Sequence, residues 1–257
     1  MDSIQLERVL SYIQQNLHEP LSLSQLASIA SYSPYHFSRL FKSSIGLSPH
    51  QYVSALRLQR AKHLLLQTNL PIRDIGMEIG QQSLGTFTTR FTEKVGVTPL
   101  QFRKSHQQTS TYLQALKDSP TWINGRPMKN EINLVEGQIK VEERFSGIIF
   151  VGLFIKPIPE GLPPYGTLLA SPGRFSFTNV RTGVYYLMAT AVNWEMDPSE
   201  ILLPHRTLRA KANVPVMVEN RLPNPEQELI LRRPRMDDPP ILISLPLLMK
   251  KYLTEIT

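Results

Sequence analysis

The sequence predicts a multidomain chain: an all-α domain built on two helix-turn-helix units, followed by a mostly antiparallel β-sandwich domain. The first observation is the spread of proline: residues 1–110 hold five of the 21 prolines, and the other 147 residues hold 16, a density that long helices do not tolerate. The second is a pair of similar segments, 21–46 and 70–96. Each combines a short apolar helix pattern, a polar turn, and a second helix pattern that a serine opens and a glycine closes.

The first predicted helix covers residues 4–17 and ends before Pro20. Its apolar residues have the spacing of one helix face that is turned to a core, and they are Leu6, Val9, Leu10, Ile13 and Leu17. Ser22 is the predicted N-cap of the next helix, and Gln25 stands three residues later, which is the pattern of a capping box.

The first helix-turn-helix unit is predicted at about residues 22–43, with its second helix at 34–43. Ser33 and Pro34 have the types preferred at the N-cap and at the first helical position. Phe37 and Phe41 fall on one side of this helix. The other side gathers hydrogen-bond donors beside a basic end, and its residues are Tyr35, His36, Ser38, Arg39 and Lys42. Taken alone, this pattern also fits a solvated helix face with an incidental arginine.

A long helix from Ser48-Pro49 to about Leu66 separates the two units. The second unit is predicted at about residues 71–93, with its second helix at 84–92 and Phe87 and Phe91 buried. The candidate DNA-binding residues here are Ser83, Leu84, Gly85, Thr88, Thr89 and Arg90. This face is poor in side chains that make bidentate base contacts, and Arg90 is expected nearer the packed side, within reach of a phosphate.

These motifs resemble the DNA-binding domain of the AraC/XylS family of bacterial transcription regulators. The resemblance covers about residues 1–105 and includes Arg57-Leu58 with Ala61 and Leu64-Leu65, and the closing pattern Gly96-Val97-Thr98-Pro99 with Phe102-Arg103. It implies that the two second helices enter successive major grooves of one duplex. It also implies base contacts from Tyr35, Ser38 and Arg39. The chain has Thr89 where the family often has arginine, so discrimination is expected to rest mainly on the first unit.

The remaining sequence predicts a linker at 108–131 and the sandwich at 132–257. Seven short runs rich in Ile, Val, Phe and Tyr lie between residues 138 and 232, with turn residues between them. The run from Phe175 to Ala189 weakly resembles transthyretin-like or carboxypeptidase-regulatory-like sandwiches. Tyr185, Tyr186, Trp194 and Met196 are either pocket residues or sandwich core. Because the composition changes at the linker, the two halves are expected to fold separately and residues 1–108 to bind DNA alone.

Charge and composition narrow the function. Residues 1–110 carry 11 Lys and Arg against 6 Asp and Glu, and this basic excess suits a polyphosphate partner. The sequence has no cysteine, and its histidines lack metal-ligand spacing. It has no apolar run of the roughly 20 residues that cross a bilayer. We expect a soluble, cytoplasmic protein with no cofactor, no metal and no membrane partner.

The predicted function is that of a sequence-specific regulator, activator or repressor, whose main partner is double-stranded promoter DNA. RNA polymerase is a further candidate partner. Residues 132–257 would sense a small-molecule effector, form a homodimer or contact another protein. The alternative is a carbohydrate-binding or enzymatic sandwich with the helical half as an adaptor. Residues 130–257 lack the cluster of paired carboxylates, or of histidine with a nucleophile, that an enzyme would need, so we expect a non-enzyme.

Overall fold

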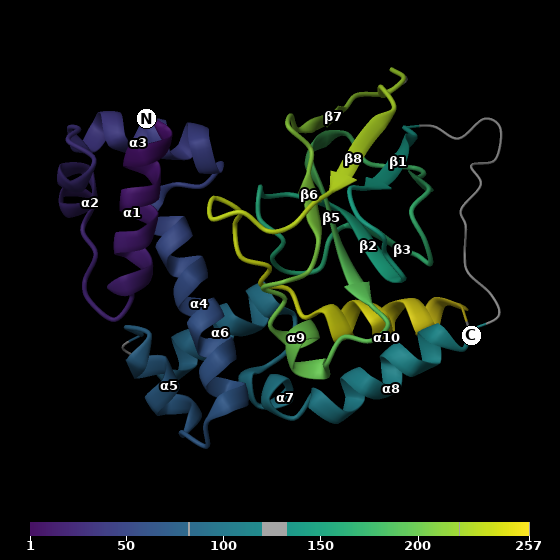
Figure 1. Ribbon diagram of the computed structural model, residues 1–257, viewed down its shortest axis with the longest axis horizontal. Coiled ribbons are helices and arrows are strands. Elements are labelled where there is room, and N and C mark those ends of the chain that lie inside the picture. Colours follow the sequence, from purple (N-terminus) through teal and green to yellow (C-terminus); the bar gives the residue numbers. More distant parts are fainter. Residues whose placement is uncertain (82, 120–132, 221, 257) are drawn as a thin grey trace. The chain divides into compact units, whose positions relative to one another are not determined.

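The computed structural model describes residues 1–81, 83–119, 133–220 and 222–256. Its ribbon, coloured along the sequence, is shown in Figure 1. The chain divides into two compact units. The helical unit comprises Met1–Arg103 and Arg235–Leu242, and the sheet unit comprises Lys104–Pro234 and Ile243–Thr257.

The helical unit contains seven described helices. They are α1 (Ser3–Gln15), α2 (Leu23–Ile29), α3 (Pro34–Ile45), α4 (Pro49–Gln67), α5 (Ile72–Glu78), α6 (Leu84–Val95) and α7 (Pro99–Arg103). The predicted caps at Ser22, Ser33 and Ser83 are confirmed, because each side chain accepts a hydrogen bond from a backbone N–H of the first turn. The capping box predicted at Ser22 is only half present, because the Gln25 side chain donates instead to the hydroxyl of Tyr12 at 2.6 Å.

The two helix-turn-helix units repeat the same construction. The turn between α2 and α3 contains Ser31 at φ 60°, and the turn between α5 and α6 contains Gly80 at φ 77°. Helices α3 and α6 both end at a left-handed glycine, Gly46 and Gly96. They are two to three residues longer than predicted, since the chain stays helical up to these glycines.

The aromatic cores of the two units also correspond. In the first unit, Phe37 and Phe41 of α3 pack ring to ring, and Phe41 meets the ring of Tyr52 in α4. In the second, Phe87 and Phe91 of α6 pack together, and Phe91 meets the ring of Phe102 in α7. All six rings are buried. The burial fixes which face each of the helices α3 and α6 leaves outside.

Segment Arg235–Leu242, called the clasp below, belongs to the helical unit although it lies more than 130 residues after α7. The Tyr52 hydroxyl of α4 donates to the carbonyl of Met236 at 3.5 Å. Farther along α4, the Lys62 ammonium group donates to the carbonyls of Ile241 at 3.2 Å and Leu242 at 3.3 Å. The helical unit is therefore not contiguous in sequence, because the clasp completes the surroundings of α4. That residues 1–108 fold and bind DNA alone stays a prediction.

The sheet unit contains β1 (Val135–Val141), β2 (Gly147–Phe154), β3 (Tyr165–Leu169), β4 (Arg174–Phe177), β5 (Gly183–Asn193), β6 (Arg209–Lys211), β7 (Val216–Val218) and β8 (Gln227–Leu231). One sheet has the order β4-β1-β8, the other the order β3-β2-β5-β6, and β7 also pairs with β5. Every strand pair is antiparallel except β1 with β8, which is parallel. The mostly antiparallel pairing agrees with the prediction, which missed β6.

Both sheets contribute to one apolar core. Val135 and Ile139 of β1 and Leu229 of β8 share it with Val151 of β2 and Leu187 of β5, and all five are almost fully buried. Alternate residues of β1 point into this core and away from it, which is the pattern of a strand with one covered face. Strand β2 is buried along its whole length.

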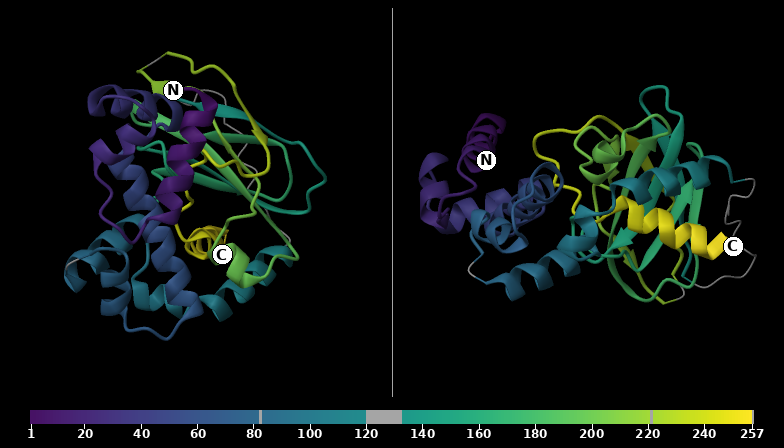
Figure 2. Two further views of the ribbon diagram at one scale, coloured as in Figure 1. Left: turned by 60° about the vertical axis from the view of Figure 1, so that its left-hand side comes forward. Right: turned by 90° about the horizontal axis from the view of Figure 1, so that it is seen from below.

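Three helices complete the sheet unit: α8 (His106–Lys117), α9 (Pro198–Leu202) and α10 (Leu245–Ile256). Helices α8 and α10 lie side by side in Figures 1 and 2. Residues 108–117 of the predicted linker thus lie in helix α8, and Leu113 and Leu116 are buried on one of its faces. The rest of the predicted linker, residues 120–132, lies outside the described residues. No strand is assigned to the described residues just before α10.

Candidate nucleic-acid interface

The outer face of α3 carries the polar residues that the sequence predicts for base contacts. Tyr35 is 75% exposed, and His36, Arg39 and Lys42 are also exposed, whereas Ser38 is half-buried. The Arg39 guanidinium lies over the Tyr35 ring, 6.0 Å from its centroid. This contact presents a planar group with several N–H donors on the exposed face of the helix, the form that suits bidentate hydrogen bonding to a guanine edge.

His36 is held differently from its neighbours. Its ring stacks on Tyr32 of the turn, with centroids 5.0 Å apart and an interplanar angle of 16°. The Tyr32 hydroxyl in turn donates to Gln5 of α1 at 2.9 Å. This chain of contacts ties α1, the turn and the start of α3 together. His36 is exposed and at the same time helps to orient α3.

Helix α6 presents a smoother face. Leu84, Gly85, Thr89 and Arg90 are exposed, and Thr88 is half-buried. Arg90 is exposed, and its guanidinium donates to Oε1 of Gln81 at 3.2 Å. The buried side of α6 is filled by Phe87, Phe91 and Val95.

Ser83 is occupied by its role as N-cap. Its hydroxyl accepts from the backbone N–H of Thr86 and donates to the Thr86 hydroxyl, both at 3.1 Å. The single proton of the hydroxyl is thus used within the protein. What Ser83 still offers to a ligand is a lone pair, beside the exposed N-terminus of α6.

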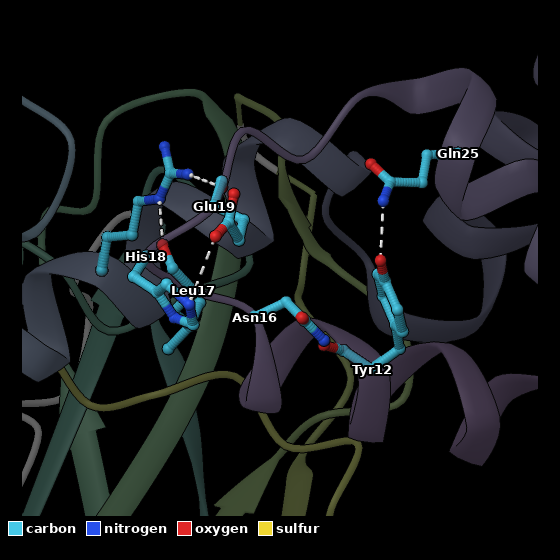
Figure 3. A network of polar contacts seen from close by, with 7 residues as sticks. Tyr12, Asn16, Leu17, His18, Glu19 and Gln25 are labelled. Carbon is cyan, nitrogen blue, oxygen red and sulfur yellow. Dashed lines mark hydrogen bonds and ion pairs between the residues drawn. The ribbon is translucent and has the colours of Figure 1, made fainter.

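Several basic residues of the helical unit act inside the fold, which the sequence did not reveal. Arg57 of α4 donates to the carbonyls of Leu17 at 3.0 Å and Glu19 at 2.7 Å, and burial lowers the pKa of Arg57. Figure 3 shows Leu17 and Glu19, and beside them the contact between Tyr12 and Gln25. Arg103 similarly donates to the carbonyls of Leu65 at 3.2 Å and Leu70 at 2.6 Å. These arginines hold the loops after α1 and α4, so they are not free to meet phosphates.

Lys62 is the third such residue, and it is only 1% exposed. Burial lowers its pKa from 10.5 to about 7, and its ammonium group lies 5.3 Å from the centroid of the Phe102 ring. The signal in the sequence is its spacing, because Lys62 shares one face of α4 with the buried Leu58, Ala61 and Leu65. Arg57, Lys62 and Arg103 thus belong to the basic excess of the helical unit but support its fold. The exposed basic residues described above lie on α3 and α6, and they are Arg39, Lys42 and Arg90.

In the sheet unit, the candidate pocket residues differ in burial. Tyr185 is a core residue whose hydroxyl donates to the carbonyl of Arg181 at 3.0 Å, and Tyr186 and Trp194 are half-buried. Nowhere in the described part of the chain do three or more His, Cys, Asp or Glu side chains gather as a metal site. None of the described helices is long and apolar enough to cross a membrane.

Comparison with known proteins matches the same region. A family model described as a helix-turn-helix domain matches residues 26–105. The chain is 31% identical over 107 residues to the multiple antibiotic resistance protein MarA of Escherichia coli, and the match covers 42% of this chain and 84% of MarA. It is 38% identical over 111 residues to the bifunctional transcriptional activator/DNA repair enzyme AdaA of Bacillus subtilis, covering 43% of this chain and 53% of AdaA.

Solved structures match over the same share of the chain. An AraC-type regulator of Chromobacterium violaceum is 33% identical, with a TM-score of 0.39, and the match covers 40% of this chain and 91% of that chain. The chain spans about half the length of AdaA and 40% of YobQ, a regulator of Bacillus subtilis that is 35% identical over 96 residues. Together with the repeated geometry of α2–α3 and α5–α6, the match to most of MarA confirms the resemblance on which the sequence analysis rests. The chain belongs to the AraC/XylS family of helix-turn-helix transcriptional regulators, the family of its relative MarA.

Proposed function

We propose that this regulator binds one asymmetric promoter site by placing α3 and α6 in two successive major grooves of the same duplex. The observation that carries the proposal is the repeat itself. Both helices have a serine N-cap, two buried phenylalanines one turn apart, and a left-handed glycine at the end. Two units of equal construction on one chain present two outer helix faces of different composition to DNA, which suits two half-sites about one helical turn apart.

We assign most of the base discrimination to α3. Its exposed face offers the Arg39 guanidinium and the Tyr35 hydroxyl, whereas the exposed face of α6 offers short side chains around Thr89. Threonine methyl groups contact thymine methyls, and exposed arginines most often meet phosphates when no base edge is in reach. Arg90 would contact a phosphate after releasing Gln81. The α6 face would then add affinity with less sequence preference.

We assign regulation to the sheet unit, where an effector, a second copy of the chain or another protein would bind. RNA polymerase is the candidate partner of an activator. A protein that acts on promoter DNA works where the chromosome is, so we place it in the cytoplasm. We also propose that the chain is not an enzyme, in keeping with relatives that are named as regulators. The name of AdaA includes a DNA repair activity, and a test for repair of damaged DNA by the purified chain would detect one here.

The test of the two-groove proposal starts from duplexes that the purified full chain selects from a random pool. Arg39→Ala should weaken binding to the selected duplex by about 1–3 kcal/mol and relax the preference at one or two base pairs. Thr89→Ala should cost less. Arg144→Ala, which removes an exposed arginine of the sheet unit, is the matched control and should change little. Equal weakening on all sequences by Arg39→Ala would show a phosphate contact and contradict the assignment.

A further inference from the structure

The clasp, residues 235–242, is the feature of the helical unit that the proposed function does not use. It touches α4 at two described points, Tyr52 and Lys62, which are ten residues apart in the sequence. At 1.5 Å per residue, these points are separated by about 15 Å along the helix. The clasp therefore runs along a substantial part of α4, the helix that stands between the two helix-turn-helix units.

Each contact point lies next to the aromatic core of a different unit. Tyr52 meets the ring of Phe41 in α3, with centroids 5.6 Å apart. Lys62 lies over the ring of Phe102, and that ring meets Phe91 of α6 at 5.7 Å. One end of the clasp is thus connected to α3 through the side chain of Tyr52. The other end is connected to α6 through two side chains, those of Lys62 and Phe102.

The docking of the clasp is built from buried groups. Lys62 is buried with carbonyl oxygens as its acceptors, and a buried amine without acceptors is costly. The side chains of Ile241 and Leu242 are 4% and 0% exposed. Burial raises the pKa of Tyr52 to about 12, with smaller contributions from Asp237 and Asp238 of the clasp. Both partners lose these surroundings when they separate.

We propose that the clasp fixes the packing of α3 and α6 on α4, and so sets the distance between half-sites that the protein accepts, with Lys62 and Tyr52 as positioning residues. The inference rests on the proposed binding in two grooves. Both ends of the clasp continue directly into the sheet unit, at Pro234 and Ile243. The clasp is thereby a covalent route by which that unit acts on α4, in addition to the connection after Arg103.

The experiment compares two variants of the full chain on two duplexes. Lys62→Met removes the donor on α4 and keeps the length of the side chain. The double variant Ile241→Ala/Leu242→Ala removes the buried side chains of the clasp and leaves α4 unchanged. Lys250→Met, at an exposed position of α10, is the control. One duplex carries the site selected by the wild-type chain, and the other carries one extra base pair between the half-sites, which turns them by about 34° and separates them by about 3.4 Å.

A positioned pair of helices binds its second half-site at a high effective concentration, and this advantage depends on geometry. We expect either variant to lose about tenfold in affinity for the selected duplex, but to stay within about twofold of wild type on the lengthened duplex. The ratio of the two affinities is the decisive quantity, because general destabilisation lowers both together. Cooperative thermal unfolding of each variant confirms that it is folded.

An unchanged ratio in a folded variant overturns the proposal, whether both affinities stay the same or fall together. If Lys62→Met does not fold, the clasp variant and Tyr52→Phe, which removes only the hydroxyl, decide in the same assay. Failure of the proposed function itself is distinguishable, because the wild-type chain would then select no preferred duplex, or would bind the two duplexes equally before any substitution.

Discussion

Replacement of the buried Lys62 by methionine should remove a pH dependence from the stability of the protein. The folded state holds Lys62 with a pKa of about 7, because burial disfavours the charged ammonium group, whereas an unfolded lysine has its ordinary value near 10.5. Between these two values the unfolded chain binds more protons at this site than the folded chain. The free energy of unfolding therefore rises with pH in this window.

The size of the effect follows from the two pKa values. One unit of pKa difference corresponds to 1.36 kcal/mol, so the full difference at Lys62 amounts to about 5 kcal/mol. The stability approaches this full gain as the pH rises to the pKa of the unfolded lysine. At pH 7 about half of the folded molecules have lost the Lys62 proton, whereas the unfolded chain keeps this proton up to pH 9. The free energy of unfolding therefore rises by about 2 kcal/mol between pH 7 and pH 9. The hydrogen bonds to the carbonyls of Ile241 and Leu242 act in the opposite direction, since they also suit the charged form.

The assay is urea unfolding of the full chain at pH 7 and pH 9, followed by circular dichroism, for the wild type and for Lys62→Met. The difference between the two proteins isolates Lys62, because every other group titrates in both. His63 has a lowered pKa, so it titrates below this window. An equal pH response in the two proteins would refute the reasoning. So would a Lys62 side-chain resonance that titrates near pH 10.5 in the folded wild type.

Three further outcomes are expected. Ser33→Ala should destabilise the helical unit by about 1 kcal/mol in chemical denaturation, because the first turn of α3 loses its side-chain cap; an unchanged midpoint would show that the cap is replaceable. Gly80→Ala should cost about 1 kcal/mol or more, because the residue has φ 77° and its Cβ would lie 3.4 Å from the Arg57 guanidinium; Gly85→Ala, where the added carbon would lie at an ordinary contact distance of 3.9 Å from the Ser83 hydroxyl, is the control. Arg57→Met should lower the melting temperature and speed proteolysis between residues 17 and 21, because the carbonyls of Leu17 and Glu19 lose their charged donor; protection equal to wild type would contradict this role.

The local features of the helical unit could be predicted because they depend on residues close in sequence. A serine before a helix, a proline at its first position and a glycine at its end each satisfy or terminate backbone hydrogen bonds within a few residues. Phenylalanines four residues apart, such as Phe37 and Phe41, place both rings on one face of the helix. The opposite face is then the exposed one. The positions of α3, α4 and α6 follow from these rules.

The features that were missed depend on partners far away along the chain. Lys62 meets carbonyls about 180 residues later, and no local pattern identifies that partner. Strand β6 has three residues and is defined by its pairing with β5 rather than by its own composition. Helix α8 is rich in Gln and Thr, so its few buried positions gave a weak periodicity. The carbonyl partners of Arg57 and Arg103 are likewise 33 to 40 residues away along the chain.

The central claim is that α3 and α6 occupy successive major grooves of one duplex. The direct measurement is hydroxyl-radical footprinting of the full chain on its selected site, with Arg39→Ala and Thr89→Ala as variants. We expect two protected stretches on one face of the duplex, about 10 base pairs apart, with Arg39→Ala weakening one stretch and Thr89→Ala affecting the other. A single protected stretch that Arg39→Ala abolishes and Thr89→Ala leaves intact would contradict the claim.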